Sequence, residues 1–203
     1  MTIANWQRSI EQIALRNRRY RILGLTSARR GAGVSVISRL LARTLATSGS
    51  NTILVDLSHP QGGAAPEISA APVGSLRAFI TPSAHGFDLL AGTTPEVHRA
   101  ATNLLALREL LMHDLSKYQH IILDFPPILD DDQTGFSTVL AATICDGLLL
   151  VGAVGKDKRA ELVEALSLLR SSGTTISGVV SNEGIDERRG RRARAERAAR
   201  ARI

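Results

Sequence analysis

A glycine-containing segment near the start of the chain has the residue types of a phosphate-binding loop. Residues 28–35 read ARRGAGVS, which follows the spacing GxxxxGK plus Ser or Thr, with Ala28 in the first small position. In such loops glycines let backbone N–H groups approach phosphate oxygens, and the helix that follows adds a favourable dipole. Gly31 and Gly33 supply this freedom here. Val34 stands where the usual lysine would be and offers no donor, so the pattern predicts the loop without its cation.

Three oxygen-bearing side chains follow at positions where Mg²⁺ would accompany a bound phosphate. Ser35 has the place of the hydroxyl ligand, and Asp56 and Asp124 end two apolar runs that are typical of buried strands. Because parallel strands open their carboxyl ends on one sheet edge, we expect Ser35, Asp56 and Asp124 to meet as metal ligands. Asp56 and Asp124 are also the only candidates for catalytic acids. The alternative is that both acids cap helices or loop amides, and that the loop is an inherited turn without nucleotide.

Strands and helices alternate along the rest of the body, which predicts an α/β, doubly wound domain with a mostly parallel sheet flanked by helices. The predicted strands cover residues 21–26, 51–56, 87–92, 121–124, 147–154 and 175–180. The predicted helices cover residues 5–19, 34–47, 75–80, 102–118 and 158–171, with one more ending near 142, and residues 57–73 are predicted as a loop.

Charge and composition divide the chain and limit its function. We predict an N-terminal helical extension over 1–20, a P-loop domain over 21–185 and an Arg-rich tail over 186–203. The tail carries +5 of the net charge of +6, so the body gives no support for nucleic-acid binding. We expect a solvated tail, with attraction to an anionic inner-membrane surface as the alternative. A lone cysteine, no apolar run of about 18 residues and no signal peptide favour a cytoplasmic protein, peripheral at the membrane if the tail binds it.

Several segments in order resemble the bacterial tyrosine kinases of capsule and exopolysaccharide synthesis, which are relatives of the MinD/ParA ATPases. They are LTSARRGAGVS, FDLLAGT, ILDFPP and CDGLLLVGAVGKDKRAELVEALSLLRSSGTTISGVVSN, and the resemblance covers roughly residues 20–185. It implies ATP or ADP with Mg²⁺ as ligand, Arg29 at the signature-lysine position of MinD and ParA, and Asn182 facing the purine. The implied nucleotide-binding positions are Ala28, Arg29, Arg30, Gly31, Ala32, Gly33, Val34, Ser35, Val36 and Asn182.

The departures from this family fall on its chemistry. Val34 replaces the loop lysine, and Asp56 lacks the second acid of an Asp-x-Asp motif, whose place falls on Ser58 or His59. The family's C-terminal tyrosine cluster and its N-terminal Glu-x-x-Arg-x-x-Arg subunit contact are not reproduced. The acidic position after ILDFPP falls on one of Asp130, Asp131 and Asp132.

We therefore expect a P-loop-fold component of exopolysaccharide or capsule biosynthesis or export that acts as a regulatory or scaffolding pseudo-kinase. The implied partner is a membrane polysaccharide co-polymerase or a related ATPase subunit, in a homo- or hetero-oligomer. Two alternatives stay open. One is a weak ATPase or tyrosine kinase in which Arg29 or Arg30 replaces the lysine, and the other is a ParA/MinD-like positioning protein.

Overall fold

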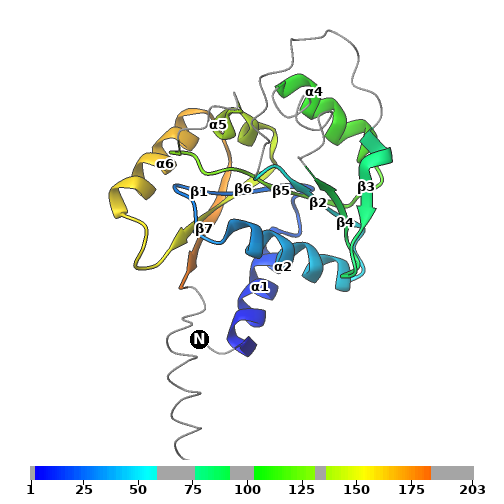
Figure 1. Cartoon of the computed structure of the whole chain (residues 1–203), viewed down its shortest axis with the longest axis horizontal. Coiled ribbons are helices and arrows are strands. Elements are labelled where there is room, and N and C mark those ends of the chain that lie inside the picture. The colour runs from blue at the N-terminus through cyan, green and yellow to red at the C-terminus, as the bar shows by residue number, and fades with distance from the viewer. Residues whose placement is uncertain (1–2, 59–75, 92–102, 131–135, 184–203) are drawn as a thin grey trace, which may run out of the picture.

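The computed structural model describes residues 3–58, 76–91, 103–130 and 136–183, and this part of the chain forms one seven-stranded sheet (Figure 1). The strand order is β3-β4-β2-β5-β1-β6-β7, and every pairing is parallel except that of β3 with β4. The doubly wound, mostly parallel sheet predicted from the sequence is confirmed. The strands are β1 Ile22–Ser27, β2 Thr52–Asp56, β3 Ile80–Pro82, β4 Asp88–Ala91, β5 His120–Asp124, β6 Gly147–Ala153 and β7 Ile176–Asn182.

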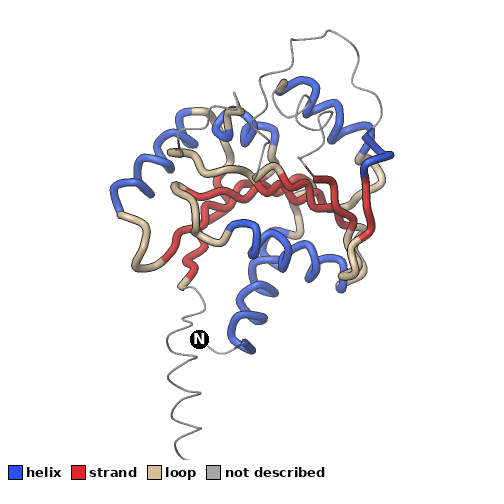
Figure 2. Tube along the Cα trace, in the orientation of Figure 1, coloured by secondary structure: helices blue, strands red, loops and turns tan. Residues whose placement is uncertain are grey.

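Helices cover both faces of the sheet (Figure 2). Alternate residues of one strand point to opposite faces, so Ile122 of β5 joins one core while Ile121 and Leu123 join the other. Both faces are therefore apolar, as in other parallel sheets with helices on each side. One face carries α1 Ile3–Asn17 and α2 Val34–Thr47, and the other carries α4 Leu104–Glu109, α5 Thr138–Ala141 and α6 Arg159–Ser171. In the described part, no helix is long and apolar enough to cross a bilayer.

The helix predicted over 102–118 is wrong in length and type. An α-helical segment, α4, runs only to Glu109, and the π-helical turn η2 over Leu110–Asp114 ends the helix. The guanidinium groups of Arg21 and Arg77 donate to carbonyl groups in and just after this turn, so side chains take acceptors that further helical turns would have used. These carbonyls belong to Leu111 and Leu115 for Arg21, and to His113 and Asp114 for Arg77.

The helix predicted over 75–80 is also wrong at its end. Leu76–Phe79 form one 3₁₀ turn, and the chain then enters the short strand β3, which pairs with β4 in antiparallel register. The turn between these strands uses Gly86 at φ 84°. Three residues are too few for an alternation of polar and apolar residues to be visible, so the sequence did not indicate this strand. Most of the predicted loop at 57–73, Asp131, Asp132 and the tail lie outside the described residues.

Candidate functional site

The segment from Ala28 to Gly33 connects β1 to α2 at the carboxyl edge of the sheet, where the phosphate loop was predicted. Gly31 and Gly33 have φ values of 88° and 87°, in the left-handed region that favours glycine. A Cβ atom on Gly33 would also collide with the side-chain amide of Asn182. The backbone therefore has the glycine-dependent shape of an anion-binding loop at a helix N-terminus.

The residue at the lysine position belongs to the core. Val34 begins α2, is only 9% exposed, and lies in the apolar cluster between α1, α2 and the sheet. The next two side chains face outward to different degrees, since Ser35 is half-buried and Val36 is exposed. The substitution thus removes a cation from the loop and adds an apolar contact beneath it.

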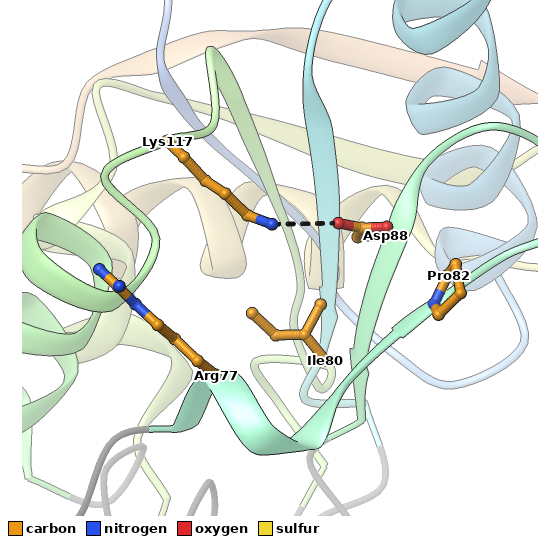
Figure 3. A pocket seen from close by; sticks show the side chains of 5 residues that line it. All are labelled: Arg77, Ile80, Pro82, Asp88 and Lys117. Carbon is orange, nitrogen blue, oxygen red and sulfur yellow. Dashed lines mark ion pairs between the residues drawn. The ribbon is translucent and has the colours of Figure 1, made fainter.

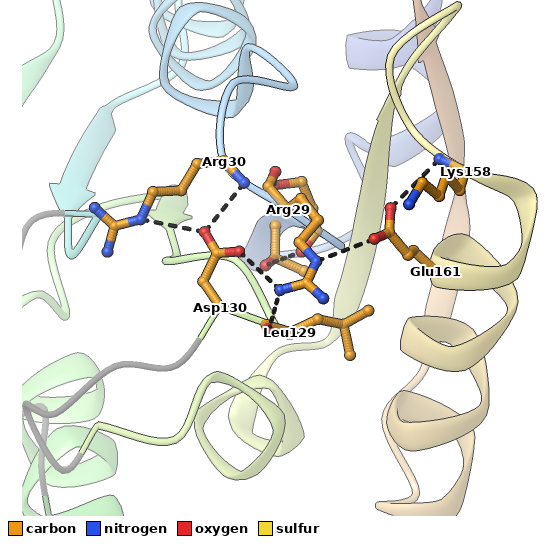
Figure 4. Close-up of polar contacts among 8 residues, drawn as sticks. Arg29, Arg30, Leu129, Asp130, Lys158 and Glu161 are labelled. Carbon is orange, nitrogen blue, oxygen red and sulfur yellow. Dashed lines mark hydrogen bonds and ion pairs between the residues drawn. The ribbon is translucent and has the colours of Figure 1, made fainter.

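The two loop arginines are bound within their own chain (Figure 4). Arg29 donates from Nη1 to the Leu129 carbonyl at 2.6 Å, and its guanidinium forms ion pairs of 3.4 Å with Asp130 and Glu161. Arg30 donates to Asp130 Oδ2 from its backbone N–H at 3.2 Å and from Nε at 3.1 Å. Figure 4 shows Asp130 between the two arginines, with Glu161 reaching Arg29 from α6. The sequence left open whether one of these arginines replaces the lysine, and here both point to Asp130.

The strand-end acids are brought together as predicted. Asp56 and Asp124 are direct neighbours in the parallel register of β2 and β5. Asp124 is fully buried, and neither of its carboxylate oxygens has a hydrogen-bond partner among the described residues. Burial raises the pKa of Asp124 to about 7, and the charge of Asp56 adds to this rise. The Ser35 hydroxyl and the Arg39 guanidinium lie near enough to lower that pKa partly, although Ser35 is not in hydrogen-bonding geometry.

Asp56 contrasts with its neighbour because both of its oxygens are engaged. Its Oδ2 lies 3.1 Å from Arg39 Nη2, while its Oδ1 accepts from the backbone N–H of Ser58 at 3.2 Å and from the Ser58 hydroxyl at 2.6 Å. This agrees with the alternative prediction that the acid caps loop amides. Arg39 was missed, although a signal exists: it lies four residues after Ser35, and such residues share one helix face.

The residues at this edge fit a magnesium ion only in part. Mg²⁺ prefers oxygen ligands, and a buried carboxylate without a partner is costly unless a cation or proton neutralises it. Asp124 is such a carboxylate, and the Ser35 hydroxyl is a further oxygen ligand. The two could hold a magnesium ion together with a bound phosphate. Asp56 is already paired with Arg39 and Ser58, so it is the least available of the three predicted ligands.

Asn182 lies beside the phosphate loop. It ends β7, and its side-chain amide donates to the Ala32 carbonyl at 2.7 Å. The resemblance implied that this residue faces a purine. In the structure its amide fixes the backbone of the phosphate loop, and the contact with a purine stays a prediction.

A separate cavity of about 440 Å³ lies at the amino end of β4 (Figure 3). Its apolar lining comes from Ile80 and Pro82, and its charged lining from Asp88, Lys117 and Arg77. Lys117 Nζ is 3.7 Å from the Asp88 carboxylate, and the Arg77 guanidinium donates to backbone carbonyls. Because these charges already have partners within the chain and none of the lining residues belongs to the phosphate loop, the cavity is not part of the phosphate-loop site.

Comparison with known proteins agrees with this fold. No family model matches the chain. Tyrosine-protein kinase CpsD of Streptococcus agalactiae is 25% identical over 176 residues, which cover 80% of this chain and 75% of the relative. The kinase domain of Escherichia coli tyrosine kinase ETK superposes with a TM-score of 0.65 and 21% identity, over 86% of this chain and 72% of that one. MinD of Pyrococcus horikoshii, in complex with Mg-ADP, gives a TM-score of 0.59 and 20% identity, over 83% and 72%.

Proposed function

Because the chain belongs to the bacterial tyrosine kinase family of MinD/ParA-like P-loop proteins, we propose that it serves exopolysaccharide biosynthesis as a non-catalytic regulatory or scaffolding subunit. Val34 is the observation that carries this proposal. In P-loop enzymes the lysine at this position neutralises charge on the transferred phosphoryl group. Here a buried valine occupies it and packs into the core. A loop without that cation keeps a backbone shape that can bind phosphate, but it lacks the positive charge that supports phosphoryl transfer.

The contacts that Arg29 and Arg30 make within their own chain argue against the alternative of an active enzyme. For Arg29 or Arg30 to replace the lysine, its guanidinium must reach the phosphates. Both are instead paired with Asp130, and Arg29 also with the Leu129 carbonyl and Glu161. Either guanidinium can reach a phosphate only after Asp130 has been displaced from it.

Nucleotide then acts as a structural ligand. The backbone amides around Gly31 and Gly33 would receive the phosphates of ADP or ATP, with Ser35 and Asp124 on the side of a magnesium ion. The ion would supply the positive charge that balances the phosphates and the buried carboxylate. The chain's own residues would hold the nucleotide in place.

The partner in this proposal is the cytoplasmic part of a membrane polysaccharide co-polymerase or a related ATPase subunit, in a homo- or hetero-oligomer. The support is membership of the family. We place the protein in the cytoplasm at the inner membrane, with the Arg-rich tail over 186–203 contributing attraction to anionic lipid. Size-exclusion chromatography of the purified chain with the purified cytoplasmic segment of the co-polymerase tests this directly, and separate elution of the two would refute it.

The test of catalysis compares purified wild type with Val34→Lys. We expect wild type to show no Mg²⁺-dependent ATP hydrolysis and no radiolabel on tyrosine. Val34→Lys should bind Mg-ATP at least about tenfold more tightly, because a hydrogen bond to a charged group contributes roughly 1.5–3 kcal/mol. Val36→Lys is the matched control, since it adds the same charge at the exposed neighbouring residue.

Two outcomes would favour the alternatives. Hydrolysis by wild type that is lost in Asp124→Ala would establish an active enzyme. A positioning protein of the ParA/MinD type predicts that wild type sediments with liposomes or DNA at low salt and that deletion of 186–203 abolishes this.

A further inference from the structure

We infer that Asp130 is an internal anion of the phosphate loop, whose carboxylate fills a three-donor site that accepts a phosphoryl group when Asp130 withdraws. The inference rests on the proposed function, because it concerns the regulation of the same loop. It assigns the site's ligand class, a phosphate or pyrophosphate group, and the chain's own competitor for that ligand.

The three donors come from two consecutive residues. The backbone N–H and Nε of Arg30 both point to Asp130 Oδ2, and Nη1 of Arg29 lies 3.4 Å from Asp130 Oδ1. A loop N–H and two guanidinium groups around one carboxylate are the donors that phosphate oxygens also select. One carboxylate leaves two arginines with an excess positive charge, which a phosphate carrying two or more negative charges balances better.

The Asp130 carboxylate is brought to the loop by the backbone, which makes it a persistent competitor. The segment after β5 runs along the start of the loop, with hydrogen bonds from Ile128 N to Ser27 O at 2.9 Å and from Leu129 N to Ala28 O at 3.0 Å. The Asp130 side chain is only 18% exposed. Because these bonds fix its position, the carboxylate acts at a high effective concentration, and any incoming anion must displace it.

An incoming anion can displace Asp130 because part of the cluster is exposed to solvent. The Arg30 side chain is 68% exposed, so it can turn with the incoming anion at small cost in contacts. Arg29 stays in place through the Leu129 carbonyl and Glu161 when Asp130 leaves. The pairings of Asp130 with Arg30 and with Arg29 must both break, and the phosphate then takes the same N–H, Nε and Nη1 donors.

The experiment is calorimetric titration of the full chain with pyrophosphate, without divalent metal and at low salt. Asp130→Asn removes the competing charge and keeps the side chain's shape, so we expect about tenfold tighter binding than in wild type. Glu161→Gln is the matched control, because it removes one negative charge from the same cluster and leaves Asp130 on both arginines. It should change the affinity less than about twofold.

Four results would overturn the inference: equal affinity of wild type and Asp130→Asn, weaker binding by the variant, no binding by either, or an equal gain in Glu161→Gln. Asp130→Ser serves in the same comparison if the asparagine variant does not fold. The outcome is separate from that of the proposed function. ATP hydrolysis by wild type refutes the non-catalytic role, whereas equal pyrophosphate affinities refute only the internal anion.

Discussion

Asp124 and Asp130 lie six residues apart at the carboxyl edge of the sheet, yet their surroundings are opposite. Asp130 sits among three donors from the phosphate loop. Asp124 is fully buried, without a hydrogen-bond partner among the described residues, and its pKa is raised to about 7. Asp130 is paired with two cations of its own chain, whereas Asp124 contacts none among the described residues.

This difference indicates which of the two acids still requires a neutralising partner. An unpaired buried carboxylate is unstable unless something neutralises it, so Asp124 marks a position for a cation or a proton. A carboxylate with three donors needs nothing more, so Asp130 marks a position that the chain fills itself. The loop's positive charge lies on Arg29 and Arg30, whereas Val34 at the lysine position carries none.

The largest predicted effect is a dependence of the unfolding free energy on pH. It tests whether the Asp124 carboxylate lacks a partner in the folded protein. Its pKa is about 7 in the folded protein and near 3.8 when unfolded, so the folded state binds more protons between these values. Unfolding free energy should therefore fall as pH rises from 4 to 8, by at most about 4 kcal/mol. Urea denaturation at both pH values measures it.

Asp124→Asn should remove most of this slope, because an amide does not ionise. The absolute stability of the variant is not the readout, since the amide introduces its own buried donors. An equal slope in wild type and variant would show that Asp124 is ionised and paired in the folded protein, and the contrast with Asp130 would disappear.

The next effect tests whether the loop shape itself is fixed. Gly33→Ala should destabilise the protein by about 2 kcal/mol or more, because it adds left-handed backbone strain to a collision with Asn182. Gly49→Ala is the control: its φ is 86°, but its Cβ would meet nothing within 4 Å, so only strain of about 1 kcal/mol applies. Equal losses in the two variants, measured by urea denaturation, would mean that Asn182 does not brace the loop.

Sequence patterns were sufficient for six of the seven strands and for the loop, because their signals are local. The run IILD ends at a buried acid, and the spacing of Gly31 and Gly33 places left-handed residues at the start of a helix. Asp56 and Asp124 follow from topology, since parallel strand ends share an edge. These inferences need no knowledge of which side chains touch.

Contacts between distant segments could not be predicted in this way. The pairing of Asp130 with Arg29 and Arg30 depends on how the segment after β5 lies along the loop, and three consecutive acids in the sequence do not show which one turns inward. The early end of the helix at Asp114 depends on Arg21 and Arg77, one of which is more than 80 residues away.

The smallest predicted effect concerns Arg39, which lies near both strand-end acids. Its ion pair with Asp56 is half exposed, so Arg39→Ala should cost only about 0.5 kcal/mol. Arg39 also acts on the second strand-end acid, because its charge lowers the pKa of Asp124. Its removal should shift the pH-dependent loss of stability to higher pH. Arg43→Ala, an exposed arginine on the same helix, is the control and should leave the pH profile unchanged. If both variants keep the wild-type midpoint, Arg39 does not act on Asp124, and this acid is even more isolated from the chain's own cations than its contrast with Asp130 implies.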